Sequence, residues 1–142
     1  MTIGRLEFSL ASGGKGDRAV LRIRVDDAEY LTACFLSEDL VKLVRRFREM
    51  GEEGRRFDLF FSNASPFSVS VTRRGPELYL RISDSFDGGV FEDRLPFEML
   101  RGALAALAEA VLLAGGMGED RRRELAEGLP ALKEWRWPVT GT

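Results

Sequence analysis

Residues 67–82 read FSVSVTRRGPELYLRI, and this stretch decides the fold. Apolar residues occupy every second position on both sides of the central Arg-Arg-Gly-Pro segment, residues 73–76. A period of two is typical of strands that bury one face, and a Gly-Pro pair favours a tight turn. The stretch therefore predicts a β-hairpin that packs one face on a hydrophobic core and leaves the other largely in water.

The same alternation extends outward from this hairpin through most of the first ninety-five residues. It recurs in residues 6–10, 20–25, 30–36, 57–61 and 90–95. Short polar or glycine-containing segments separate these runs, as turns and loops require. We expect about six or seven strands in a mainly antiparallel sheet.

Three helices are predicted from apolar spacing and end signals. The first begins at Ser37, a good N-cap residue, and runs to about Met50. The second opens with Pro96 and stops at Gly115 and Gly116. The third begins near Glu119, and its internal Pro130 is expected to kink or restart it.

Together these elements predict an α+β fold, with the sheet packed on one face by two or three helices. Residues 1–142 are expected to form a single domain, because the length suits one ordinary domain and not two. Residues 1–50 comprise strands and the first helix, and residues 56–115 comprise strands and the second. Residues 118–137 form the C-terminal helix and an aromatic tail. The order suggests two strands-then-helix units.

Composition excludes several catalytic centres. The chain has no histidine and one cysteine, so it cannot supply a Ser-His-Asp triad, a Cys-His pair or an imidazole metal ligand. The 21 basic and 23 acidic residues give a net charge of −2, without a basic arm or an acidic tail. No segment has the length of a membrane span or the pattern of an export signal, so we expect a cytoplasmic protein that does not associate with membranes.

Three motifs are interpreted as structural. Gly13-Gly14-Lys15-Gly16 lacks the hydroxyl residue of a phosphate-binding loop and precedes a strand, so a hairpin loop is predicted. The acidic residues around Gly88 and Gly89 lack the alternating ligands of a calcium loop. Cys34 lies in an apolar strand and is expected to be a buried small hydrophobe. We expect no cofactor, no metal and no enzymatic activity.

The second helix, Pro96 to Ala114, is apolar most of the way round, so one core face cannot cover it. Either the third helix or another subunit must do so. We therefore predict a non-catalytic protein-interaction module, homodimeric and with an unknown protein partner. The candidate interface residues are Ala106 and Leu113 on this helix, with Trp135 and Trp137 in the tail.

An alternative places single-stranded nucleic acid on the open sheet face, although the balanced charge makes this the second choice. Arginines interleaved with aromatic rings on a sheet are typical of such binders. The candidate residues are Arg22, Arg24, Phe60, Tyr79 and Arg81. Acidic residues share this face, so cross-strand ion pairs on a solvated sheet are the simpler interpretation.

Overall fold

The fold was analysed in a computed structural model, which describes residues 2–12, 18–60, 67–84, 86 and 88–136. These described residues form seven strands, three α-helices and one 3₁₀ segment. The first unit contains β1 (Leu6–Ser12), β2 (Arg18–Val25), β3 (Ala28–Phe35), α1 (Leu36–Arg46) and the 3₁₀ segment Phe47–Gly51. The second contains β4 (Arg56–Phe60), β5 (Phe67–Arg74), β6 (Glu77–Asp84), β7 (Val90–Arg94) and α2 (Phe97–Ala114), followed by α3 (Glu119–Glu134).

The α+β class and the antiparallel strands agree with the prediction, and the seven strands are divided between two sheets. One sheet has the order β1-β2-β3 and the other β4-β5-β6-β7. The predicted hairpin of residues 67–82 is formed by β5 and β6, which pair residue for residue from Phe67↔Asp84 to Arg74↔Glu77. Gly75 takes the left-handed conformation at its turn, with φ of 62°, which suits glycine.

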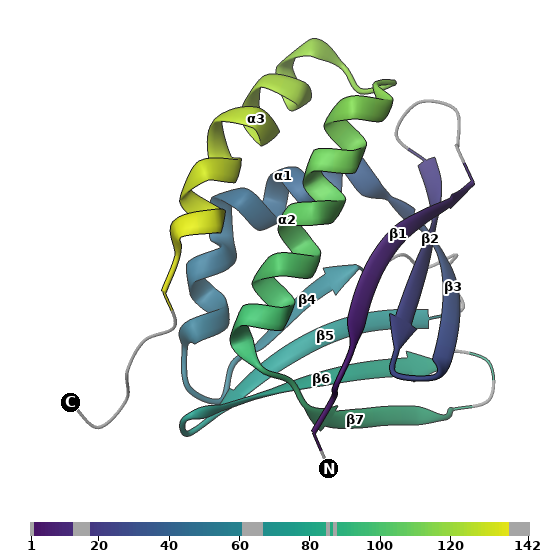
Figure 1. Cartoon of the computed structure of the whole chain (residues 1–142), viewed down its shortest axis with the longest axis vertical. Helices are drawn as coiled ribbons and strands as arrows, with labels where there is room; N and C mark the ends of the chain where they lie inside the picture. The colour runs from purple at the N-terminus through teal and green to yellow at the C-terminus, as the bar shows by residue number, and fades with distance from the viewer. Residues whose placement is uncertain (1, 13–17, 61–66, 85, 87, 137–142) are drawn as a thin grey trace.

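Both the helices and the three-stranded sheet lie on one side of the four-stranded sheet (Figure 1). The strands of the two sheets run in different directions, and their inner faces meet where Phe8 of β1 packs edge-on against Phe60 of β4, with ring centroids 5.3 Å apart. Thr32 of β3 donates a hydrogen bond from Oγ1 to the Phe67 carbonyl at 2.8 Å. At the other end, Ile3 N donates to the Arg94 carbonyl at 2.8 Å. One hydrophobic core therefore serves both strands-then-helix units.

The start of α1 differs from the prediction at Ser37. The helix begins at Leu36 with Phe35 as its N-cap residue, and no side chain caps it. Ser37 instead lies buried in the first turn, where its Oγ accepts a hydrogen bond from Arg121 Nη1 at 3.2 Å. The hydroxyl therefore helps to join α1 to α3. Pro130 is also accommodated without a break, because α3 continues to Glu134.

The long apolar helix α2 is covered by its own chain. It lies between β1 and α3, as Figure 1 shows, and contacts both. Its buried residues extend over most of its circumference: Leu100, Ala103, Leu104, Ala105, Leu107, Ala108 and Val111. The sequence predicted that either the third helix or another subunit would cover α2. Within one subunit, α3 and β1 together cover most of its apolar surface.

Candidate interaction surfaces

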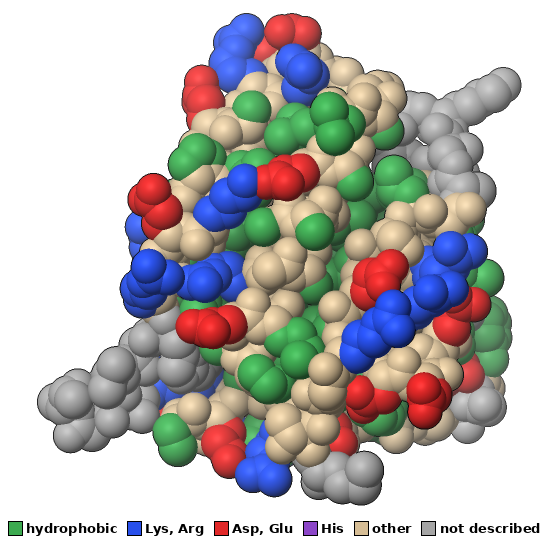
Figure 2. Space-filling model, viewed as in Figure 1, with side chains coloured by type: hydrophobic (Ala, Val, Ile, Leu, Met, Phe, Trp, Pro, Cys, Tyr) green, Lys and Arg blue, Asp and Glu red, His purple; other side chains and the backbone are tan. Residues whose placement is uncertain are grey.

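One uncovered strip remains on α2 after its neighbours are in place. The strip consists of Gly102, Ala106, Ala110, Leu113 and Ala114, all of which are exposed. Leu113 has 89% of its side-chain surface exposed, the highest value among the exposed large hydrophobic residues of the described chain. Glu109 borders the strip and is tied to α3 by an ion pair with Lys133. Figure 2 shows that little charge lies along this part of the surface.

The predicted interface residues fall into two groups. Ala106 and Leu113 lie seven positions apart on the same exposed side of α2. Trp135 is half-buried between Phe47 and Phe97, with ring centroids at 5.0 and 4.7 Å. Its carbonyl accepts a hydrogen bond from Arg101 Nη1 at 2.6 Å. Trp135 thus closes over the core of its own chain, and Trp137 lies outside the described residues.

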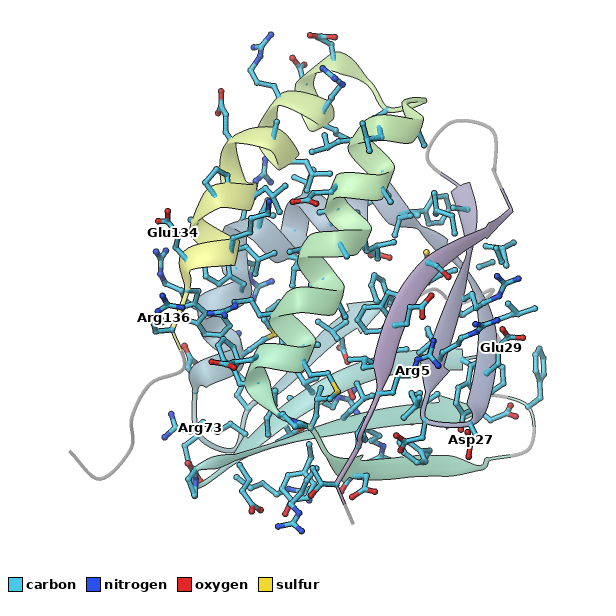
Figure 3. All side chains as sticks on the ribbon, in the orientation of Figure 1. Arg5, Asp27, Glu29, Arg73, Glu134 and Arg136 are labelled. Carbon is cyan, nitrogen blue, oxygen red and sulfur yellow. The ribbon has the colours of Figure 1, made fainter. Side chains whose placement is uncertain are left out.

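The outer face of the three-stranded sheet carries two of the arginines predicted for nucleic acid. Arg22 and Arg24 both approach Oε1 of Glu29 through their Nε atoms, at 3.0 and 3.1 Å. Figure 3 shows Glu29, together with Arg5, on this sheet and away from α3. Leu31, two residues after Glu29 on the same face of β3, is also exposed. The arginines are therefore already engaged by a carboxylate.

Tyr79 and Arg81 project from the other sheet. The Tyr79 hydroxyl donates to Glu77 Oε2 at 2.9 Å, and the Arg74 guanidinium lies 4.7 Å from its ring centroid. This hydrogen bond raises the pKa of Tyr79. Arg81 Nε donates to Ser83 Oγ at 3.3 Å. The ring face of Tyr79 is thus occupied by a neighbouring side chain.

The prediction that Phe60 lies on the open sheet face is wrong. Its side chain is 1% exposed, in contact with Phe8, because the β4–β5 register shifts between Asp58 and Phe60. A bulge adds one residue to a strand, so Leu59 and Phe60 both turn inward. The five candidate residues therefore do not form one platform: one is buried, and the other four are divided between two sheets.

Carboxylates of the four-stranded sheet are also paired. Arg74 contacts Glu92 at 2.9 Å, and Arg94 contacts Glu77 at 3.0 Å. Hydrogen bonds from Arg94 and then Tyr79 lower the pKa of Glu77. The cross-strand ion pairs expected for a solvated sheet are present on this face.

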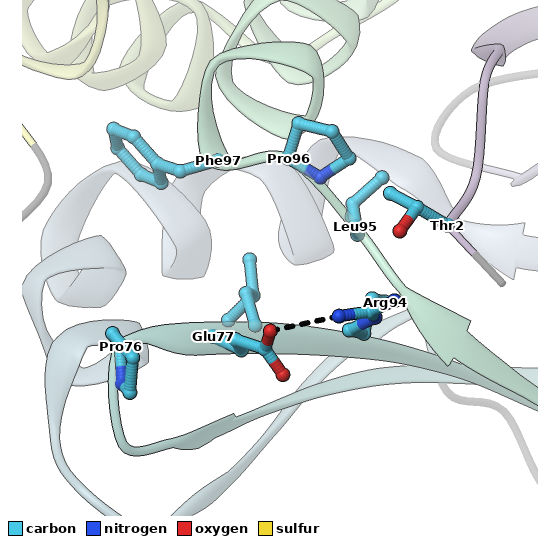
Figure 4. A pocket seen from close by; sticks show the side chains of 8 residues that line it. Thr2, Pro76, Glu77, Arg94, Leu95, Pro96 and Phe97 are labelled. Atoms are coloured by element: carbon cyan, nitrogen blue, oxygen red, sulfur yellow. Dashed lines mark hydrogen bonds and ion pairs between the residues drawn. The ribbon is translucent and has the colours of Figure 1, made fainter.

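A hollow of about 230 Å³ lies where β6 and β7 meet the start of α2 (Figure 4). Pro76 and Phe97 form apolar walls, and the Glu77–Arg94 ion pair crosses its edge. The remaining lining residues are Thr2, Leu78, Leu95 and Pro96. The hollow therefore combines apolar walls with two charged side chains that pair with each other.

Two titratable groups, the buried Cys34 and the half-buried Asp39, lie near the start of α1. Cys34 is 4% exposed, and burial followed by the Asp39 charge raises its thiol pKa to about 12. Burial, followed by the neighbouring Glu38 charge, raises the pKa of Asp39 to about 7. Asp39 Oδ2 has no hydrogen-bond partner in the described part of the chain. The thiol is therefore held in its neutral, unreactive form, as the buried position predicted from sequence implies.

Comparison with known proteins found no match. No family model matches the chain, and no curated protein or solved structure shows significant similarity to it. Among the described residues, no group of three or more Cys, Asp or Glu side chains is arranged to hold a metal ion. No helix in the same residues is both long and apolar enough to cross a bilayer.

Sequence reasoning missed one basic cluster. Lys42 and Arg46 of α1 line a common hollow with Arg55 and Arg56, which lie ten residues further along the chain. Arg46 lies in the last turn of α1, where a basic side chain complements the helix dipole, so its position in the sequence has an ordinary structural explanation. The 3₁₀ segment Phe47–Gly51 joins α1 to the segment before β4, and in the fold Lys42 and Arg46 line the same hollow as Arg55 and Arg56. The paired arginines at 45–46 and 55–56 were the only sequence signal for this arrangement.

Proposed function

We propose that this protein is a non-catalytic protein-interaction module that acts as a homodimer, with the α2 strip as the contact between subunits. One observation carries the proposal: an exposed, uncharged helix face persists although β1 and α3 already cover the rest of α2. A cytoplasmic location is part of the proposal, since the single buried thiol has no partner for an internal disulfide.

The composition of the strip suits a second copy of the same helix. Gly102, Ala106 and Ala110 recur every fourth residue, so they form one ridge of small side chains. Small residues allow two helix axes to approach to roughly 8 Å, the near end of the range for packed helices. A two-fold axis through the ridge would place each Leu113 against the partner helix, which supplies the apolar anchor that interfaces need.

Sedimentation equilibrium tests the proposal with three arginine variants. Ala106→Arg and Leu113→Arg each place a charge in the strip, whereas Ala131→Arg places the same charge at an exposed position of α3. We expect a dimer at micromolar concentration for the wild type and for Ala131→Arg. The two strip variants should weaken association by about 10-fold or more, because a buried unpaired charge costs at least ~1.4 kcal/mol.

Two results would reject the α2 strip as the contact between subunits. The first is a wild-type monomer throughout the micromolar range. The second is a dimer whose mass is unchanged in both strip variants while circular dichroism reports native folding. In either case α2 would not be the contact, and the exposed Leu113 would have no role in self-association.

The structure gives little support to single-stranded nucleic-acid binding as a second function. Such binding would need arginines and stacking aromatic rings on one shared sheet face. Phe60 is buried, and Arg22 and Arg24 both engage Glu29. What remains near Tyr79 is a mixed-charge surface, on which Arg74 pairs with Glu92 and Arg94 pairs with Glu77.

A further inference from the structure

A polar hollow of about 240 Å³ lies between the second half of α1 and β4. Four basic side chains contribute to its wall: Lys42 and Arg46 from α1, Arg55 from the segment before β4, and Arg56 at its start. Phe57 and Asp58 complete the lining. These residues come from two segments joined by the 3₁₀ turn, so the cluster exists only in the folded chain.

Glu49 holds two of the arginines in place. Arg46 Nε lies 2.5 Å from Glu49 Oε2, and Arg55 Nη2 lies 2.8 Å from Glu49 Oε1. Arg55 also contacts Glu52 Oε2 through Nη1 at 2.9 Å. The hydrogen bond from Arg46 lowers the pKa of Glu49, so this carboxylate remains charged at neutral pH. The two guanidinium groups are therefore oriented before any ligand arrives.

The other two basic groups retain free donors. Within the described residues, Lys42 makes no hydrogen bond or ion pair. Arg56 contacts Asp58 through Nε at 3.3 Å, and its two terminal nitrogens have no partner in the same part of the chain. One ammonium group and one guanidinium edge are thus available at the hollow, next to two fixed guanidinium groups.

We propose that this hollow binds a phosphate group. Four cations line it, and three carboxylates (Glu49, Glu52 and Asp58) form ion pairs with its three arginines, so Lys42 is the one lining cation without an ion pair in the described residues. A carboxylate is planar and is satisfied by a single guanidinium fork, whereas a phosphate has oxygens in four directions and accepts donors from several sides. Donors that converge from α1 and from β4 fit the tetrahedral anion. This site is independent of the α2 dimer.

An NMR titration of the full chain at low ionic strength tests the site. The probes are sodium phosphate and O-phosphoserine, with sodium acetate at the same ionic strength as the reference. We expect saturable amide shifts confined to residues 42–46 and 55–58 with the phosphate probes. Tighter binding of O-phosphoserine would assign a phosphomonoester as ligand, and equal or weaker binding would assign free phosphate.

Substitutions distinguish specific phosphate binding in the hollow from nonspecific attraction of anions to basic side chains elsewhere on the surface. Lys42→Gln and Arg56→Gln should each weaken phosphate binding by about 10-fold, since each removes a charge-assisted hydrogen bond. Arg123→Gln removes an exposed arginine of α3 and should leave the affinity unchanged. All three positions are exposed, so the variants should retain the wild-type spectrum elsewhere.

Three results would overturn the proposal. Shifts that spread over basic residues of both sheets and α3, without saturation, would indicate nonspecific attraction only. Equal affinities for acetate and phosphate would remove the argument from tetrahedral geometry. Unchanged affinity in Lys42→Gln and Arg56→Gln would show that their free donors do not contact the anion.

Discussion

The α-carbon of Gly128 on α3 lies so close to Val44 on α1 that a β-carbon at position 128 would stand 2.6 Å from Val44 Cβ. A second contact, at 2.8 Å, would fall on Val44 Cγ2. Real carbon atoms do not approach so closely. The absence of a side chain at this position therefore sets how near the two helices can lie.

Gly128→Ala should destabilise the protein, although alanine normally favours a helix over glycine. We expect a loss of about 1–3 kcal/mol in the free energy of unfolding, because the added methyl group must push α3 away from α1. Gly118→Ala is the control: Gly118 precedes α3, has open space where a β-carbon would stand and lies outside the α2 strip, so the substitution should change the stability by less than about 1 kcal/mol. Urea denaturation measures both, and a stabilised Gly128→Ala would contradict the close packing.

The Val44 side of the contact can be tested by a double variant. Val44→Ala removes Cγ1 and Cγ2, two of the three atoms that the new β-carbon would meet, and leaves Val44 Cβ in place, so it relieves part of the clash. The combined Val44→Ala/Gly128→Ala protein should therefore be more stable than the sum of the two single effects predicts, by about 1 kcal/mol. Additive losses would mean that the two Val44 methyl groups do not cause the strain of Gly128→Ala.

Trp135→Ala should detach the end of α3 from the core. Trp135 joins three parts of the fold, since its ring contacts Phe47 after α1 and Phe97 at the start of α2. We expect a loss of about 2–4 kcal/mol, whereas Trp135→Phe, which retains an aromatic ring, should lose less than half as much. Thermal unfolding distinguishes them, and near-native stability in Trp135→Ala would assign the ring a role outside this chain's core.

The alternation of residues 67–82 was sufficient to predict the central hairpin, because every position of β5 and β6 pairs without a shift. The same rule was wrong at Phe60, since a single extra residue in β4 turns both Leu59 and Phe60 inward. A bulge leaves no mark on composition, so period alone does not reveal it. The alternation of apolar residues indicates which face of a strand a residue occupies, but it does not indicate which strands are neighbours. The division into two sheets could therefore not be predicted from it.

The candidate surfaces were predictable to different degrees. The excess of apolar residues on α2 was visible in the sequence, but the cover that β1 supplies to it depends on how the sheets are stacked. Ala106 and Leu113 are exposed, and their role in an interface stays a prediction. The basic hollow depends on the turn at Phe47–Gly51, which brings Lys42 near Arg56. Helical and strand periodicities describe one segment at a time. Neither predicts that residues from α1 and β4 will lie close together in the fold.

Cys34 should resist thiol reagents until the protein unfolds. Its side chain is 4% exposed, and burial raises its pKa to about 12, so little thiolate forms at pH 8. We expect reaction with a disulfide reagent to follow the global unfolding rate, with complete reaction in strong denaturant. Asp39→Asn removes the smaller, electrostatic cause of the raised pKa and should leave the protection in place. Rapid labelling of the native protein would contradict the buried position.

Asp39 should make the stability fall as the pH rises from about 4 to about 7. Its pKa is about 7 in the folded protein, mainly because of burial, against a reference value of 3.8. In this window the folded state holds more protons than the unfolded state, so the free energy of unfolding decreases with pH and levels off above pH 7. Lys42 opposes the shift, and burial together with Glu38 outweighs it.

Asp39→Asn removes this titration and should stabilise the protein most at alkaline pH. We expect its advantage over the wild type to grow by about 1–2 kcal/mol between pH 5 and pH 8, after allowance for the partial exposure of the carboxyl group. Asp27→Asn removes a carboxylate from the exposed β2–β3 turn and serves as the control, with no such growth. Urea denaturation at both pH values measures the difference. An advantage that shrinks toward pH 8 would mean that Asp39 is ionised, and stabilised by its surroundings, in the folded protein.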